Sequence, residues 1–193
     1  MERFARLFGI TEHSTVLDLG GSPFIWELLR VRPRLTLLNL PSSNIAPGWC
    51  EVRYGDACDA PFASRQFDVV FSNSVIEHVG DWERQRNFAR ECARCGNGYY
   101  VQTPNRWFPV DPHTFFPFVH WLPRTCWPKM IRYSPRALFF HAGPADLEDL
   151  AGLRLLGRRE MAELFPDAKI IAEKFLGITK SLIAVRRGSP PPC

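Results

Sequence analysis

The stretch VLDLGGSP, residues 16–23, organises the whole sequence. Its apolar residues end at an acid, two glycines and a proline, and proline suits the first turn of a helix. A short apolar run that ends at glycines is typical of a parallel strand buried on both faces. Glycines there let a ligand approach the backbone, and the next helix offers free N–H groups to an anion. The stretch therefore predicts a ligand-binding strand end in an α/β sheet.

Further strands and helices alternate along the first half of the chain. Strands are expected at residues 35–40, 49–54, 67–72 and 99–102, and helices at 2–9, 23–29 and 81–93. The first helix is expected to cover the sheet edge, and Gly96 to stop the third. This alternation predicts a parallel sheet with helices on both faces. Ligands bind such sheets at the carboxyl ends of the strands, so 18–22, Asn39, Asp56 and 72–78 are expected to be neighbours.

The end of the chain has a different pattern. A helix is expected over 158–165, stopped by Pro166, and two strands over 169–175 and 179–185. The short link at Gly177 favours an antiparallel hairpin. Residues 188–193 are expected to form a disordered tail. Because 193 residues with 46% hydrophobic content bury one good core, we expect a single domain over 1–187.

The segment 104–143 is expected to form a cap on the substrate side. Residues 104–141 hold five basic residues and one acid, an excess of 5 − 1 = +4, together with ten aromatic residues. Three interpretations stay open. The cap walls a pocket for an anionic or aromatic small molecule, with Trp107 as a surface and Arg106 or Arg124 as anion donors. It touches a membrane as a peripheral contact, or it is only the packed lid of the sheet.

Bulk composition narrows the class of protein. No run of 18 apolar residues is present, and Met1–Arg6 has no apolar signal core, so a soluble, cytoplasmic protein is expected. The six cysteines lack the spacing of a disulfide framework, and the isolated Cys92/Cys95 pair is expected to have no chemical role. A net charge of +4 is too small to indicate a nucleic-acid partner.

The glycine pattern also bears on the cofactor. Ser22 and Phe24 stand where a dinucleotide fingerprint has its second and third glycines, which disfavours nicotinamide and flavin cofactors. The ordered set VLDLGG at 16–21, GDA at 55–57, FDVVFSNSVIEHV at 67–79 and TPN at 103–105 is similar to class I S-adenosylmethionine-dependent methyltransferases, close to the small bacterial type 11 group. The resemblance covers about residues 14–108. It implies a Rossmann-like, three-layer αβα fold with a seven-stranded, mostly parallel sheet and an antiparallel C-terminal hairpin.

The resemblance implies S-adenosyl-L-methionine as cofactor and assigns residues to it. The set is Asp18, Gly20, Gly21 and Ser22 for the methionine part, Asn39 and Leu40 for the ribose, Asp56 and Ala57 for the adenine, and Ser72 and Asn73 beneath the transferred methyl group. Asp18 suits the ammonium group, and the helix N-terminus suits the carboxylate. Asn39 departs from the family, which usually has an acid there, so it would bind a diol without charge assistance.

Two histidines are candidates for the catalytic base. Methyl transfer to a hydroxyl needs alignment and a base, and His113 and His78 are the candidates because an unperturbed histidine side chain titrates near neutral pH. One branch of the superfamily binds a divalent cation through a Glu-x-x-Glu-His run and a later histidine. Ser74 replaces the first of those acids here, which leaves Glu77, His78 and His113 as an alternative ligand set. We expect chemistry without a metal.

These observations predict an enzyme that moves a methyl group from S-adenosylmethionine to a small-molecule acceptor, at a hydroxyl oxygen. Two other acceptors remain open, an RNA and a lipid-linked saccharide. A degenerate methyltransferase fold that binds partners without turnover is a further alternative, based on the broken glycine pattern and Asn39. Acceptor specificity is expected in the segment 104–143, where the resemblance is weakest.

Overall fold

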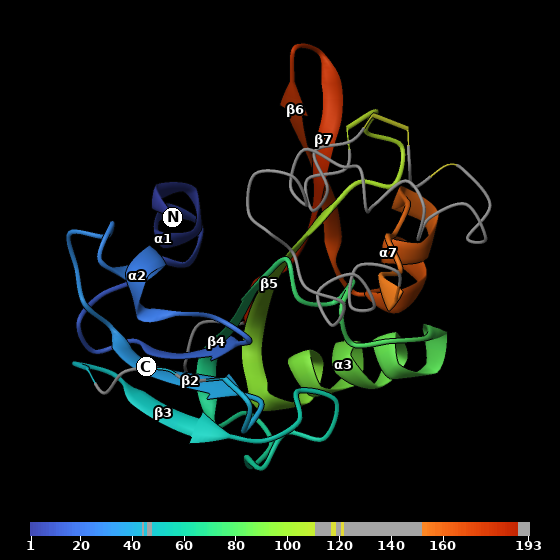
Figure 1. Ribbon diagram of the computed structural model, residues 1–193. Coiled ribbons are helices and arrows are strands. Elements are labelled where there is room, and N and C mark those ends of the chain that lie inside the picture. The colour runs from blue at the N-terminus through green and yellow to red at the C-terminus, as the bar shows by residue number, and fades with distance from the viewer. Residues whose placement is uncertain (44, 46–47, 111–116, 119–120, 122–151, 189–193) are drawn as a thin grey trace.

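The computed structural model describes residues 1–43, 45, 48–110, 117–118, 121 and 152–188 (Figure 1). The described helices are α1 (Glu2–Phe8), α2 (Pro23–Trp26), α3 (Trp82–Cys95) and α7 (Arg158–Leu164). The described strands are β1 (Thr15–Leu19), β2 (Arg34–Asn39), β3 (Glu51–Tyr54), β4 (Phe67–Asn73), β5 (Gly96–Pro104), β6 (Lys169–Phe175) and β7 (Ile178–Arg186). The expected order of strands and helices is confirmed.

The seven strands form one sheet in the order β3-β2-β1-β4-β5-β7-β6. Strands β1 to β5 run parallel, whereas β7 pairs antiparallel with both β5 and β6. This confirms the mostly parallel sheet with an antiparallel C-terminal hairpin. The strand order reverses between β1 and β4. The carboxyl ends of these two strands are therefore the switch point at which such sheets bind ligands.

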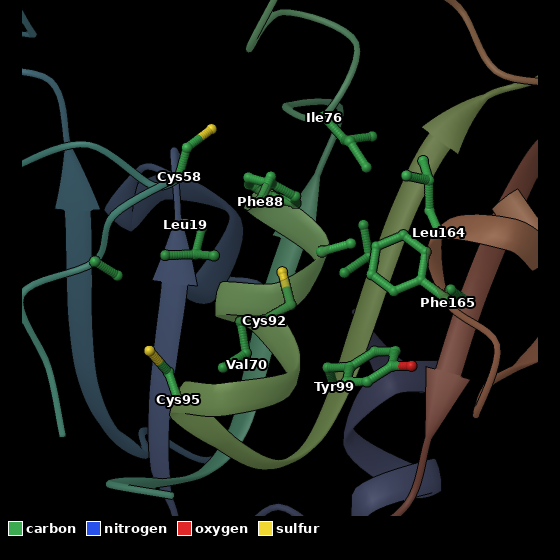
Figure 2. Packing of buried hydrophobic residues seen from close by; sticks show 14 of the residues in the cluster. Leu19, Cys58, Val70, Ile76, Phe88, Cys92, Cys95, Tyr99, Leu164 and Phe165 are labelled. Atoms are coloured by element: carbon green, nitrogen blue, oxygen red, sulfur yellow. The ribbon is translucent and has the colours of Figure 1, made fainter. Parts of the chain in front are cut away.

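Helices cover both faces of the sheet, so the three-layer αβα architecture is confirmed. On one face, Phe4 of α1 lies 4.9 Å from Phe71 and 5.7 Å from Trp26, ring centre to ring centre. On the other face, α3 and α7 bury a larger cluster that includes Phe88 and Phe165 (Figure 2). Successive residues of a strand point to opposite faces. Asp18 therefore belongs to the face that carries Trp26.

Two sequence-based expectations about the first helices are wrong. Because Phe4 packs on the central strands, α1 covers a face of the sheet instead of its edge. The helix expected over 23–29 is the four-residue α2. Half of the expected apolar stripe is exposed, with Phe24 at 68% and Leu28 at 65%, whereas Ile25 and Leu29 are partly buried against the core. Only Trp26 of α2 is buried. One inward-facing indole fills the space that a longer amphipathic helix would cover.

Helix α3 ends at Cys95, and Gly96 is its C-cap, as expected. Gly96 has an extended φ of −113° instead of a left-handed one, because it is also the first residue of β5. A Cβ at Gly96 would lie 2.5 Å from the carbonyl oxygen of Gly98. Glycine is therefore required by the close backbone approach. Cys92 and Cys95, at the end of α3, are buried free thiols of the core cluster.

The C-terminal elements match the expected boundaries closely. Helix α7 is followed by β6 and β7, which form the expected hairpin around Gly177. Arg186 of β7 pairs with Asp167 at 2.7 Å, and Asp167 also accepts a hydrogen bond from the Tyr99 hydroxyl of β5. Most of the segment 104–143, and the tail beyond Gly188, lie outside the described residues. None of the described helices combines the length and apolar character needed to cross a bilayer.

Candidate functional site

The glycine turn after β1 is held between the ends of β2 and β4. The N–H of Gly20 donates to the carbonyl of Leu38 in β2 at 2.8 Å. On the other side, Ser72 Oγ in β4 donates to the carbonyl of Leu19 at 3.1 Å, and Ser72 is fully buried. These two bonds continue the sheet past the last residue of β1. The expected gathering of 18–22, Asn39 and Ser72 at one sheet edge is therefore what the structure has.

Asp18 is buried directly below this turn. Its Oδ2 accepts a hydrogen bond from Trp26 Nε1 at 2.7 Å. Its Oδ1 is also buried and has no hydrogen-bond partner in the described part of the chain. Burial raises the pKa of Asp18 to about 7, although the bond from Trp26 acts in the opposite direction. The carboxyl group therefore has unused capacity to accept a donor, above all a cationic one.

Both glycines of the turn are required by its geometry. Gly20 has a φ of +74°, which favours glycine. A Cβ on Gly21 would lie 1.8 Å from Asp18 Oδ2, so no side chain fits between the turn and the carboxyl group. Ser22 is exposed and precedes α2, and its side chain does not cap that helix. The two glycines therefore let the turn pack directly against Val75 and the Asp18 carboxyl group.

Asn39 fixes the same turn from β2. Its Nδ2 donates to the carbonyl of Gly21 at 3.0 Å, and the residue is 8% exposed. A carboxylate at this position could not donate that bond. The amide at this position therefore has a structural reason, because it holds the glycine turn in place. Leu40, the next residue, is 55% exposed beside it.

Asp56 follows β3 and is engaged by a cation. Arg84 Nη2 of α3 lies 2.8 Å from Asp56 Oδ2, and the N–H of Cys58 donates to Oδ1 at 2.8 Å. Partial burial raises the pKa of Asp56, but the Cys58 N–H and the Arg84 guanidinium together outweigh it and lower the pKa. Asp56 stays charged at neutral pH. Ala57 beside it is half-buried and packs on the core.

The end of β4 and the segment after it separate into buried and exposed groups. Glu77 is fully buried and accepts a hydrogen bond from Thr103 Oγ1 at 2.9 Å. Asn73 and His78 are exposed. Adjacent in sequence, Glu77 and His78 therefore lie in different environments.

The structure bears only in part on the candidate catalytic histidines and the alternative metal ligands. His113 lies outside the described residues. Within the ranges that the structure describes, no three His, Cys, Asp or Glu residues are grouped as a metal site would require. The alternative ligand set Glu77, His78 and His113 stays a prediction.

Sequence reasoning missed two residues that shape the site, Trp26 and Arg84. The burial of Trp26 was not predicted, because the expected helix placed Phe24 and Leu28 on the buried face. The signal that could have found it is the need of a buried carboxyl group for a donor. Arg84 is 28 residues from Asp56, and no spacing rule connects a residue in the first turn of α3 with a strand end.

The start of the cap segment also differs from one expectation. Arg106 was an expected anion donor, but its guanidinium is bonded to Glu160 Oε1 at 2.6 Å and to the carbonyl of Leu155 at 3.1 Å. Glu160 is shared with Arg154, whose Nη2 lies 2.9 Å from Oε1, so it compensates only part of the charge of the two arginines. A cavity of about 570 Å³ opens beside it, lined in part by Trp107, Arg158 and Arg159. Trp107 is 64% exposed.

Comparison with known proteins gives a consistent result. A family model described as a methyltransferase domain matches residues 27–101, which begins after the glycine turn. No curated protein matches the chain significantly. An S-adenosylmethionine-dependent methyltransferase from Methanosarcina mazei is similar in structure, with a TM-score of 0.53, 13% identity and coverage of 94% of each chain.

Two further solved structures agree with that likeness. One comes from a complex between the Haloferax volcanii Trm112 methyltransferase activator and a methyltransferase, with a TM-score of 0.58, 16% identity and coverage of 95% of this chain and 86% of that chain. The other is an S-adenosylmethionine-dependent methyltransferase from Aquifex aeolicus, with a TM-score of 0.52, 12% identity and coverage of 95% and 87%. At such low identity, these structures establish the fold.

Proposed function

We propose that this chain is a class I methyltransferase that uses S-adenosylmethionine to methylate a hydroxyl oxygen of a small molecule. The match of a methyltransferase-domain model to residues 27–101 and the fold shared with S-adenosylmethionine-dependent methyltransferases support this proposal. The observation that carries the proposal is the edge of the sheet at which Asp18, Gly20 and Asn39 meet Ser72. Two features of this edge fit the cofactor. Asp18 Oδ1 is a buried acceptor without a hydrogen-bond partner in the described part of the chain, and Gly20 and Gly21 carry no side chain at the end of β1.

We assign the cofactor's parts to successive strand ends. Asp18, Gly20, Gly21 and Ser22 hold the methionine part, Asn39 and Leu40 face the ribose, Asp56 and Ala57 the adenine, and Ser72 and Asn73 lie beneath the methyl group. The ammonium group suits Asp18, because a charge-assisted bond to a buried acceptor is strong. Asn39 Oδ1 can accept from a ribose hydroxyl while Nδ2 keeps its bond to the turn.

The proposed chemistry needs little from the protein beyond position and a base. S-adenosylmethionine supplies an activated methyl group on a sulfonium. The chain's own contribution is to align the acceptor oxygen in line with that group and to take its proton. His78 is exposed after β4 and can reach solvent and ligand. His78 and His113 are the proposed bases, and each is tested by replacement with alanine.

Protonation of Asp18 gives the proposal a pH signature. With its pKa at about 7, the carboxyl group is half protonated at neutral pH. An ammonium group bound beside it favours the charged form. Cofactor binding should therefore tighten as the pH rises through about 7, and it should release a proton.

Calorimetric titration with S-adenosylmethionine and S-adenosylhomocysteine tests the proposal. We expect both to bind at micromolar concentration. Transfer of a radiolabelled methyl group to a set of hydroxy acids and phenols then tests the acceptor, with amines of matched shape as the control. Failure of both cofactor forms to bind would contradict the cofactor assignment, and transfer to the amines alone would contradict the hydroxyl acceptor.

A further inference from the structure

The turn between β6 and β7 presents three large apolar side chains to solvent. Phe175 is 56% exposed, Leu176 87% and Ile178 49%. In Figure 1 the hairpin of β6 and β7 rises above the rest of the sheet. We call these three residues, with the flanking Lys174 and Lys180, the hairpin tip. Exposed apolar residues grouped in this way mark an interaction site more often than isolated ones do.

Folding does not account for the leucine at the centre of the tip. Leu176 has a φ of +49° and Gly177 one of +81°. A two-residue hairpin turn with two positive φ values favours Asn-Gly, because leucine is strained there by about 1 kcal/mol. At 87% exposure, Leu176 gains almost no packing in return. Packing among the described residues therefore does not offset the strain at Leu176.

The charges around the tip indicate the chemistry of that contact. Lys174 and Lys180 are exposed, and in the part of the chain that the structure describes neither takes part in an ion pair. The nearest acid along the strand, Glu173, is half-buried and accepts a hydrogen bond from Gln102. Lysines can lay their apolar stems along an inserted tip while the ammonium groups meet anionic headgroups.

Exposed aromatic rings stand beside the tip. Asn105 links the two regions, since its N–H donates to the carbonyl of Lys180 at 2.9 Å and its Nδ2 to that of Thr179 at 2.8 Å. Two residues later, Trp107 lies 6.3 Å from Trp121, ring centre to ring centre. Trp121 is 46% exposed. Tryptophan is the side chain most typical of the membrane–water interface.

We propose that the hairpin tip inserts into the headgroup region of a bilayer that contains anionic lipids. Three observations favour a bilayer over a protein groove. The tip is a narrow protrusion, its apolar residues are flanked by lysines that form no ion pair within the described residues, and tryptophans lie at its side. Arg158 and Arg159, which line the adjoining cavity, add positive charge to the same region. Because Pro104 at the carboxyl end of β5 pairs with Ser181 near the start of β7, the tip lies beyond the cofactor edge of the sheet.

Flotation of the full chain with vesicles tests the proposal without any cofactor or acceptor. Vesicles of phosphatidylcholine with about 30% phosphatidylglycerol supply the negative surface, and pure phosphatidylcholine is the comparison. We expect binding to the anionic vesicles that weakens with salt. Replacement Leu176→Asn should weaken it at least about five-fold, because most of the transfer free energy of one leucine is lost. Lys174→Gln combined with Lys180→Gln should remove most of the preference for anionic vesicles.

The matched control is Leu28→Asn, which removes an apolar side chain of similar exposure, 65%, from the segment after α2. It should leave vesicle binding unchanged. Asparagine tolerates the left-handed conformation, so Leu176→Asn should unfold at the same temperature as the parent chain or higher. The proposal is overturned if the parent chain does not bind anionic vesicles or if Leu176→Asn binds them as well as the parent. It is also overturned if Leu28→Asn weakens binding as much as Leu176→Asn does.

Discussion

The ends of β1 and β3 carry the same kind of residue in opposite environments. Asp18 is fully buried, bonded only to an indole N–H, and keeps one oxygen without a partner in the described chain. Asp56 is partly exposed and is paired with Arg84 at 2.8 Å. Burial raises the pKa of the first to about 7, whereas the N–H of Cys58 and the guanidinium of Arg84 lower the pKa of the second despite partial burial. An acidic side chain at a strand end can thus keep a free acceptor oxygen, as Asp18 does among the described residues, or be paired with a cation, as Asp56 is.

The largest expected effect comes from adding a side chain where the glycine turn packs against Asp18. Replacement Gly21→Ala places a Cβ 1.8 Å from Asp18 Oδ2, so the turn or the carboxyl group must move. We expect a loss of about 3 kcal/mol or more in the free energy of unfolding, as for severe overpacking. Urea denaturation measures it. Gly48→Ala is the control, because no atom lies within 4 Å of its added Cβ, and an equal loss there would argue against the close approach.

Replacement Asp18→Asn keeps an acceptor for Trp26 but removes the charge offered to the cofactor. A hydrogen bond to a charged group contributes about 1.5–3 kcal/mol, so S-adenosylmethionine should bind roughly 10- to 100-fold more weakly. Calorimetry at pH 7.5 measures the affinity. An unchanged affinity would remove Asp18 from the proposed site.

The same variant has the opposite effect on stability. The pKa of Asp18 is raised from 3.8 to about 7 in the folded chain. At pH values between these two, the carboxyl group is therefore protonated in the folded state and ionised in the unfolded state. The stability of the parent chain should therefore fall as the pH rises from 4 to 7, relative to Asp18→Asn. Thermal unfolding across this range shows whether the two curves diverge in that direction.

Replacement Asn39→Asp tests the amide that holds the turn. The carboxylate cannot donate to the carbonyl of Gly21, and two acceptors would then face each other at the present 3.0 Å. We expect a loss of about 1–3 kcal/mol in stability, the cost of an unmet hydrogen bond in a buried site. Asn39→Ser, which keeps a donor, should lose less when both are compared by urea denaturation. A more stable Asn39→Asp would contradict this role for the amide.

Replacement Asp56→Asn should have the smallest effect. Asp56 and Arg84 have side chains 38% and 45% exposed, so their ion pair contributes about 1 kcal/mol or less. Because the pKa of Asp56 is lowered, this stability is present above the ordinary pKa and is lost as the pH falls below it. Parent and variant should therefore unfold at the same temperature in acid and differ slightly at pH 7. A large difference in unfolding temperature at pH 7 would mean that Asp56 contributes more than a partly exposed ion pair with Arg84.

Most of the fold could be predicted from the sequence because it depends on local patterns. The apolar runs ending at Gly20 and at Gly55 gave the parallel strands, and Gly177 gave the hairpin. Helix α2 could not be predicted, because its length depends on how one buried tryptophan fills the space over the sheet. The candidate site divides in the same way. Its residues come together at one sheet edge as expected. The partner of Asp18, Trp26, lies in the next helix but on a face that the expected helix did not bury, and the partner of Asp56, Arg84, comes from a distant helix that no spacing rule connects to it.

The most direct test of the Asp18 assignment is the number of protons released when S-adenosylmethionine binds. Titration at pH 7 in two buffers of different ionisation enthalpy gives this number for the parent chain and for Asp18→Asn. With the pKa of Asp18 at about 7 and the ammonium group beside it, the parent should release about half a proton more than the variant. Equal proton release by the two proteins would contradict the assignment of Asp18 to the cofactor's ammonium group.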